Sequence, residues 1–72
     1  MKNDTNNFAK RTSIQVKSIL RSNTLNADVL NEGDGNHFTL YCEHSIENAY
    51  KIKKSGFIRL GKTHNGYYIK CH

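Results

Sequence analysis

The spacing of apolar and polar positions is most regular in the last third of the chain. Large and apolar side chains recur at helical spacing between Ser45 and Gly56, which predicts a helix over residues 45–54. Ser45 is a suitable N-cap, and Gly56 is a suitable residue to end the helix. The stripe expected to face the core comprises Ile46, Ala49, Tyr50 and Lys53, with Ile52 at its margin.

Two strand-like runs follow this helix and meet at Asn65-Gly66, a pair typical of a tight β-turn. If these two residues form the turn, Leu60 pairs with Cys71. Successive side chains of a strand point to opposite faces. The core side is then expected to hold Ile58, Leu60, Tyr67, Ile69 and Cys71, and the outer side Arg59, Thr63, Tyr68, Lys70 and His72.

Two further alternating runs precede the helix and predict another hairpin. Between them lies the loop 32–36, whose two glycines supply the positive φ that a reversal needs. The inward positions of these runs are expected to be Leu25, Ala27, Val29, Phe38, Leu40 and Cys42.

Residues 12–20 fit both the helical spacing and the alternating pattern of a strand. Val16 and Leu20 lie at helical spacing, whereas Ile14 and Val16 fit an alternating pattern. The β-branched side chains in this segment favour a strand, which we predict here, with a helix as the alternative. Residues 1–11 are mostly polar, so we expect them to form a disordered N-terminal tail.

Together the elements predict an α+β fold: a strand meander over residues 13–43, one helix packed on one face of an antiparallel sheet of four or five strands, and a C-terminal β-hairpin. Residues 12–72 are expected to form this single small domain, because 72 residues with 36% hydrophobic side chains allow only one thin core. Such a core favours a binding protein, alone or as a homodimer, over an enzyme with a deep cavity.

The net charge of +5 is unevenly distributed along the chain. Residues 23–50 include carboxylates and no Lys or Arg, whereas both flanking parts are basic. A basic balance favours a polyanionic partner, and it also keeps a small protein soluble. The chain has no apolar run long enough to cross a bilayer and no signal-peptide core near Met1, so we expect a soluble, cytoplasmic protein without membrane contact.

The outer side of the last hairpin is the candidate contact surface. An aromatic ring at Tyr68 beside cations at Arg59 and Lys70 is a composition that stacks a nucleobase and holds a phosphate. The alternative is an ordinary solvent-exposed strand face, where Tyr, Lys and Arg are common. The predicted partner-binding residues are Arg59, Lys62, Tyr68, Lys70 and His72, with Lys51 and Lys54 at the end of the helix.

Four histidines and two cysteines raise the question of a metal or catalytic site. Cys42 and His44 can share a strand face, but Cys71 and His72 are adjacent and point to opposite faces, so a tetrahedral zinc site does not close. No spacing brings two histidines together as an acid–base pair. We therefore expect no metal, no cofactor and no enzymatic activity, and cysteines that behave as small apolar side chains.

In size, Asn-rich composition and segregated charge, the chain resembles the small proteins that bacteriophages and other mobile elements use against host machinery, among them anti-CRISPR proteins. The segment from Ser45-Ile46-Glu47-Asn48-Ala49 through Asn65-Gly66-Tyr67-Tyr68-Ile69 is similar to the helix-plus-hairpin ending of some of them. The resemblance implies an inhibitor or regulator of a larger complex that handles nucleic acid, bound through carboxylates that mimic phosphates or through cations that hold acidic protein. Direct DNA or RNA binding by the basic hairpin face is the alternative function.

Overall fold

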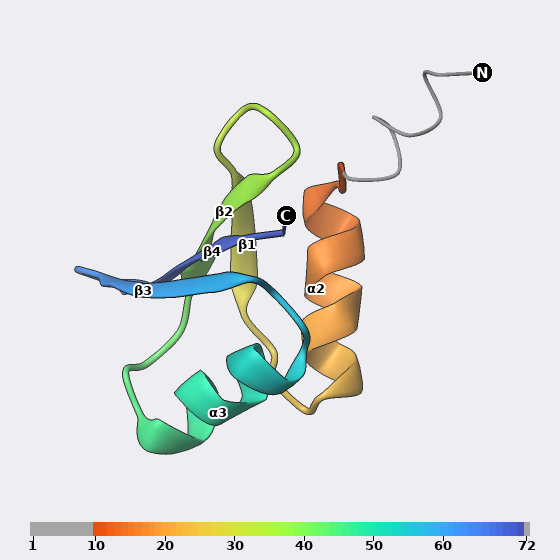
Figure 1. Ribbon diagram of the computed structural model, residues 1–72. Helices are drawn as coiled ribbons and strands as arrows, with labels where there is room; N and C mark the ends of the chain where they lie inside the picture. Colours follow the sequence, from red (N-terminus) through yellow and green to blue (C-terminus); the bar gives the residue numbers. More distant parts are fainter. Residues whose placement is uncertain (1–9, 72) are drawn as a thin grey trace.

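The computed structural model describes residues 10–71, and Figure 1 shows how their elements are arranged. These elements are α2 (Ser13–Ser22), β1 (Asp28–Asn31), β2 (His37–Tyr41), α3 (Ile46–Lys54), β3 (Arg59–Thr63) and β4 (Gly66–Lys70). The strands form one antiparallel sheet in the order β1-β2-β4-β3. This confirms the α+β class and a four-stranded antiparallel sheet, but the prediction of one helix was wrong, because residues 10–71 contain two. Residues 1–9 of the tail expected over 1–11, and His72, lie outside the described residues.

The additional helix is α2, which occupies the segment 12–20 that was predicted as a strand. Thr12 is its N-cap: the Thr12 hydroxyl accepts from the Gln15 amide at 3.1 Å, and the Gln15 side chain accepts from the Thr12 amide at 2.8 Å. Val16 and Leu20, which lie one turn apart, are both fully buried. The capping box and this pair of core contacts outweigh the strand preference of the β-branched residues.

Both helices pack on one face of the sheet, where they share a single core with the strands. Val16 and Leu20 enter this core from α2, and Ile52 enters it from α3. The C-terminal ends of the helices also meet, because the Asn23 side-chain amide donates to the Ser55 hydroxyl at 2.9 Å. The buried core consists of Val16, Leu20, Leu25, Ala27, Phe38, Leu40, Ile52, Tyr67, Ile69 and Cys71.

The first predicted hairpin is confirmed, with its loop over 32–36. Gly33 and Gly35 have φ angles of +116° and +74°, and the Asn31 side-chain oxygen accepts from their amides at 2.9 and 3.2 Å. The predicted inward residues of both strand runs are buried or partly buried. The loop also contacts the chain before α2, since the Arg11 amide donates to the Gly35 carbonyl at 2.8 Å.

The predicted extent of the second helix is confirmed by α3, but the predicted core stripe is mostly wrong: Ala49 packs against the core, and the other stripe residues do not enter it. Ser45 is the N-cap and Gly56 follows the helix with a φ of +92°, as expected. The side chain that α3 buries fully is Ile52, which was placed at the margin of the stripe. Residues that were predicted in the core but are exposed are Ile46 (91%), Tyr50 (62%), Lys53 and, just before β3, Ile58 (63%).

The rotation of α3 about its axis is set where the helix begins. From β4, the Tyr67 hydroxyl donates to the Ser45 carbonyl at 3.1 Å and accepts from the Ser45 amide at 3.0 Å. The His44 ring packs edge-on against the Tyr67 ring at a centroid distance of 5.3 Å, and its Nε2 lies 2.7 Å from the Gly66 carbonyl oxygen. These contacts hold the start of α3 against β4, and they leave Ile46 and Tyr50 of the expected stripe exposed.

The C-terminal hairpin is present, but its turn lies one residue earlier than predicted. Thr63 pairs with Gly66 across the two turn residues 64–65, and Leu60 faces Ile69 instead of Cys71. Each residue therefore pairs with a partner two positions away from the expected one. A shift of two positions leaves every strand side chain on the face predicted for it, since the side-chain period of a strand is two.

Gly66 is required by packing and not by the turn. The glycines with positive φ in the described chain are Gly33, Gly35 and Gly56, so Gly66 does not adopt the turn conformation that was expected of it. A Cβ atom on Gly66 would lie 1.9 Å from the Leu40 carbonyl oxygen. The backbones of β4 and β2 thus approach each other so closely here that no side chain fits.

Candidate nucleic-acid interface

The sheet face opposite the helices carries three rows of side chains that run across the strands. The pairing of β3 with β4 and of β4 with β2 determines which residues are neighbours in each row. The first row, called here the basic row, is Arg59, Lys70 and His37; the second is Gly61, Tyr68 and Thr39; the third is Thr63, Gly66 and Tyr41. Directly opposite residues have Cβ atoms roughly 5 Å apart, so the basic row places two cations and an imidazole side by side.

Three rings follow a zigzag over this face. His37 and Tyr68 are stacked, with centroids 5.9 Å apart and ring planes inclined by 20°. Tyr41 is the diagonal neighbour of Tyr68 on β2 and is 41% exposed. The residues opposite Tyr68 are small, Gly61 and Thr39, whereas Tyr41 lies between Gly66 and the carboxylate residue Asp28. Tyr68 is therefore the ring without a bulky neighbour opposite it on β2 or β3.

Asp34 orients the His37 ring from the adjoining loop. One Asp34 carboxylate oxygen lies 2.5 Å from His37 Nδ1, and the other accepts from the amides of Asn36 and His37, each at 2.9 Å. The Asn36 amide, then the His37 side chain and the His37 amide, lower the pKa of Asp34 from 3.8 to about 2. The carboxylate is therefore ionised at neutral pH and holds Nδ1 of His37 toward the loop.

The open face is electrically polarised between its two edges. Arg59 and Lys70, over β3 and β4, take part in no ion pair within residues 10–71. Near β1, Asp28 pairs with Lys17 at 3.4 Å, and Glu32 accepts a hydrogen bond from a threonine hydroxyl of β2. The uncompensated positive charge therefore lies beside the Tyr68 ring.

The structure brings together Arg59, Tyr68 and Lys70 from the predicted partner-binding set. It separates Lys62 from them, because Lys62 pairs with the buried Tyr67 and so lies on the helix side of the sheet. Lys62, which was in the predicted partner-binding set but not on the predicted outer side of the hairpin, therefore does not share the surface of Arg59.

The two helix lysines of the predicted set also lie away from the open face, on α3. Lys51 is already engaged, since its Nζ donates to the Thr24 carbonyl at 3.1 Å and lies 3.3 Å from a Glu47 carboxylate oxygen. Lys54 is exposed at the end of the helix. His72, the last member of the set, lies outside the described residues.

His37 and Tyr41 belong to the surface but were not in the predicted set. Both point outward from β2, which the alternation of their strand had indicated. Their place beside Tyr68 depends on the pairing of β2 with β4, two strands separated in sequence by α3 and β3. No local signal in the chain reports that pairing.

The cysteines are free thiols on the core side of the fold. Burial raises the pKa of both Cys42 and Cys71, which keeps these thiols protonated and weakly nucleophilic at neutral pH. Within residues 10–71, no three His, Cys, Asp or Glu side chains come together as a metal-ligand group. Neither of the two helices in that range has the length and hydrophobicity needed to cross a bilayer.

Comparison with protein-family models, curated proteins and solved structures found no match for this chain. The resemblance to small phage and mobile-element inhibitors, including anti-CRISPR proteins, therefore stays a hypothesis. The residues of the open face are the basis for a functional proposal.

Proposed function

We propose that the chain is a small non-enzymatic binding protein whose open sheet face binds single-stranded nucleic acid. The observation that carries this proposal is the basic row, Arg59, Lys70 and His37, lying directly beside the Tyr68 ring that stacks on His37. Non-specific single-strand binding combines cations that follow the phosphates with aromatic rings on which bases stack. Both parts are present here on one surface.

The arrangement favours a single strand over a duplex. Tyr68 lies in the middle of the face and Tyr41 at the end of the neighbouring strand, and an unpaired base has access to such rings. A duplex keeps its bases stacked on one another, so it offers such rings only phosphates and groove edges. The strand is expected to follow β3 and β4, away from the carboxylates near β1.

Most carboxylates of the chain are already used inside it, which weakens the alternative of phosphate mimicry. Asp28 pairs with Lys17 and Asp34 with His37. Glu47 pairs with a lysine of its own helix, and Glu32 accepts from a hydroxyl of β2. A surface that mimics phosphates needs several carboxylates that lie close together and are not paired within the protein. The basic face is therefore a better candidate for the functional surface, through direct contact with nucleic acid.

Fluorescence anisotropy with labelled single-stranded RNA and DNA oligonucleotides of about ten nucleotides tests this proposal. Tyr68→Ala is expected to weaken binding roughly tenfold or more, because a stacked base is lost, and Tyr68→Phe is expected to retain most of the affinity. Arg59→Gln and Lys70→Gln should each reduce the slope of log affinity against log salt by about 0.7, as expected for one lost phosphate contact with a single strand.

Lys54→Gln is the matched control, because it removes the same charge from α3 on the other side of the sheet. Its salt slope should equal that of the unchanged protein. Absence of binding at low ionic strength contradicts the proposal, and so does a Lys54→Gln variant that loses as much affinity as Arg59→Gln.

A further inference from the structure

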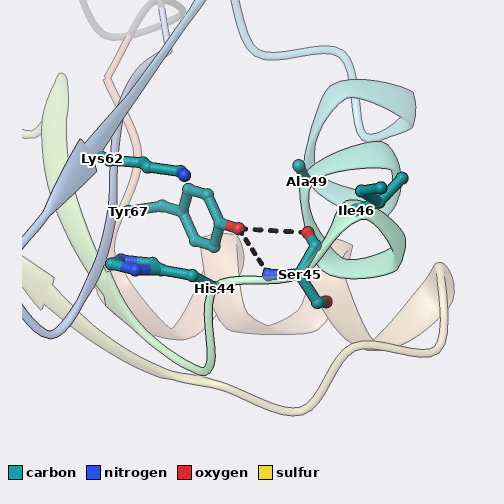
Figure 2. A pocket seen from close by; sticks show the side chains of 6 residues that line it. All are labelled: His44, Ser45, Ile46, Ala49, Lys62 and Tyr67. Carbon is teal, nitrogen blue, oxygen red and sulfur yellow. Dashed lines mark hydrogen bonds between the residues drawn. The ribbon is translucent and has the colours of Figure 1, made fainter.

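A pocket of about 370 Å³ lies between the sheet and the start of α3, on the face opposite the basic row. Figure 2 shows Ile46 and Ala49 on its α3 side, and Lys62 extending over the Tyr67 ring from β3. The pocket is lined by His44, Ser45, Ile46, Ala49, Lys62 and Tyr67. None of the proposed nucleic-acid contacts uses these side chains.

The outer edge of β3 borders this pocket and lacks a partner strand in the described sheet, because β3 ends the order β1-β2-β4-β3. Thr63 and Gly66 close the two-residue turn, so their backbone groups bond each other. Bonded and non-bonded pairs alternate along an antiparallel ladder, which turns the N–H and C=O groups of Leu60 and Lys62 outward. The edge therefore offers two donors and two acceptors to an added strand.

The surroundings of this edge are apolar and basic. Ile46 and Ile58 are among the most exposed large apolar side chains of the described chain, and Leu60 is only partly buried. Lys62 takes part in no ion pair within residues 10–71. The edge and the pocket together thus combine backbone groups without a partner strand in the described sheet, apolar surface and an uncompensated cation.

We propose that the edge of β3 and the adjoining pocket bind an extended segment of a partner protein in which an acidic and an apolar residue lie two positions apart, so that both side chains share one face of the added strand. Paired with β3, such a segment completes the ladder through its backbone. Its side chains on the α3 side place a carboxylate opposite Lys62 and an apolar group in the pocket beside Ile46 and Ala49. Directly opposite side chains of paired strands lie close enough for this ion pair.

Charge argues for a different partner protein over a second copy of this chain. Two copies paired edge to edge around Gly61 would place Lys62 opposite Leu60 of the other copy. The lysines of both copies would then share one face of the new ladder with no carboxylate facing them. An acidic segment is complementary to this edge, and the edge is not complementary to itself.

A titration of the ¹⁵N-labelled protein with a peptide of about six residues, in which a Glu and a Leu lie two positions apart, tests the docking site. The backbone amide resonances of Leu60 and Lys62 are expected to change in chemical shift, and these amides should gain protection from hydrogen exchange. Lys62→Glu should weaken binding at least about fivefold, because the charge opposite the peptide carboxylate is reversed. Lys70→Glu, on the other face of the sheet, should leave peptide affinity unchanged.

The same peptide with alternate amides N-methylated is the control for strand pairing, because it keeps the side chains and loses the donors. The proposal would be overturned if the methylated peptide bound as tightly as the unmethylated one. It would also be overturned if the chemical-shift changes were centred on Tyr68 and Lys70. A concentration-dependent dimer that Lys62→Glu dissociates would overturn it too, since the occupant would then be a second copy. Tyr68→Ala should weaken oligonucleotide binding roughly tenfold or more without changing peptide affinity, so the two sites can fail separately.

Discussion

Gly66 is the position at which a single methyl group is expected to disturb the sheet most. Gly66→Ala places a Cβ atom 1.9 Å from the Leu40 carbonyl oxygen, so β4 has to move away from β2. We expect the free energy of unfolding to fall by about 3 kcal/mol, as in overpacked cores. Urea denaturation followed by circular dichroism measures this loss.

Gly61 is the matched control, because no atom lies within 4 Å of where its Cβ would be. Gly61→Ala is expected to leave stability unchanged or to raise it slightly, since alanine loses less backbone entropy in a strand. Equal destabilisation by the two substitutions would show that strand conformation, and not the approach of β4 to β2, makes Gly66 necessary.

Asp34 is expected to make the free energy of unfolding depend on pH in the acid range. Its pKa is about 2 in the folded chain against an ordinary 3.8, so its contribution to stability is complete above the ordinary pKa. That contribution declines as the pH falls from about 4 through 2. The urea midpoint of the unchanged protein should therefore drop over this range, and that of Asp34→Asn should drop less. Parallel curves for the two proteins would contradict the role assigned to Asp34.

At the scale of elements, the docking of α3 depends on the Tyr67 hydroxyl. Tyr67→Phe removes both hydrogen bonds to the Ser45 backbone. The expected loss is about 1–2 kcal/mol of unfolding free energy, measured by urea denaturation. Tyr50→Phe is the control, because the Tyr50 side chain is exposed on α3. The stability of this variant should equal that of the unchanged protein. A loss of the same size in both variants would mean that hydroxyl removal alone is responsible.

Helix ends could be predicted from the sequence better than helix faces. Ser45 and Gly56 act locally through a hydroxyl and a positive φ, so their identity is sufficient to delimit α3. Which side of α3 is buried depends on Tyr67, which lies more than twenty residues further along the chain. The strand predicted at 12–20 was wrong for a local reason: the prediction depended on β-branched content, whereas Thr12 and Gln15 form a capping box that starts a helix.

At the scale of the whole molecule, the hairpin part of the candidate interface could be predicted from the sequence and the β2 part could not. Arg59, Tyr68 and Lys70 share a hairpin, and their common face survives the displaced turn because alternation has a period of two. His37 and Tyr41 join them only through the insertion of β4 between β2 and β3. Sequence neighbours are usually neighbours in a sheet, and this pairing departs from that rule.

The fold therefore presents two chemically different surfaces on one thin sheet. One face carries cations and rings, and the other side, at the free edge of β3, carries apolar groups with Lys62. If both proposals hold, nucleic acid and an acidic partner protein can be held at the same time. That arrangement suits a regulator of a complex that handles nucleic acid, the function implied by the resemblance to small phage and mobile-element proteins.

The strand order also has a consequence for synthesis on the ribosome. β4 is the last of the four strands to be made, yet it lies inside the sheet, between β2 and β3. Until residues 66–70 leave the exit tunnel, β2 and β3 have no strand to join them, and Phe38 and Leu40 lack Tyr67 and Ile69. The nascent chain therefore cannot complete its sheet stepwise, and folding waits for its final strand.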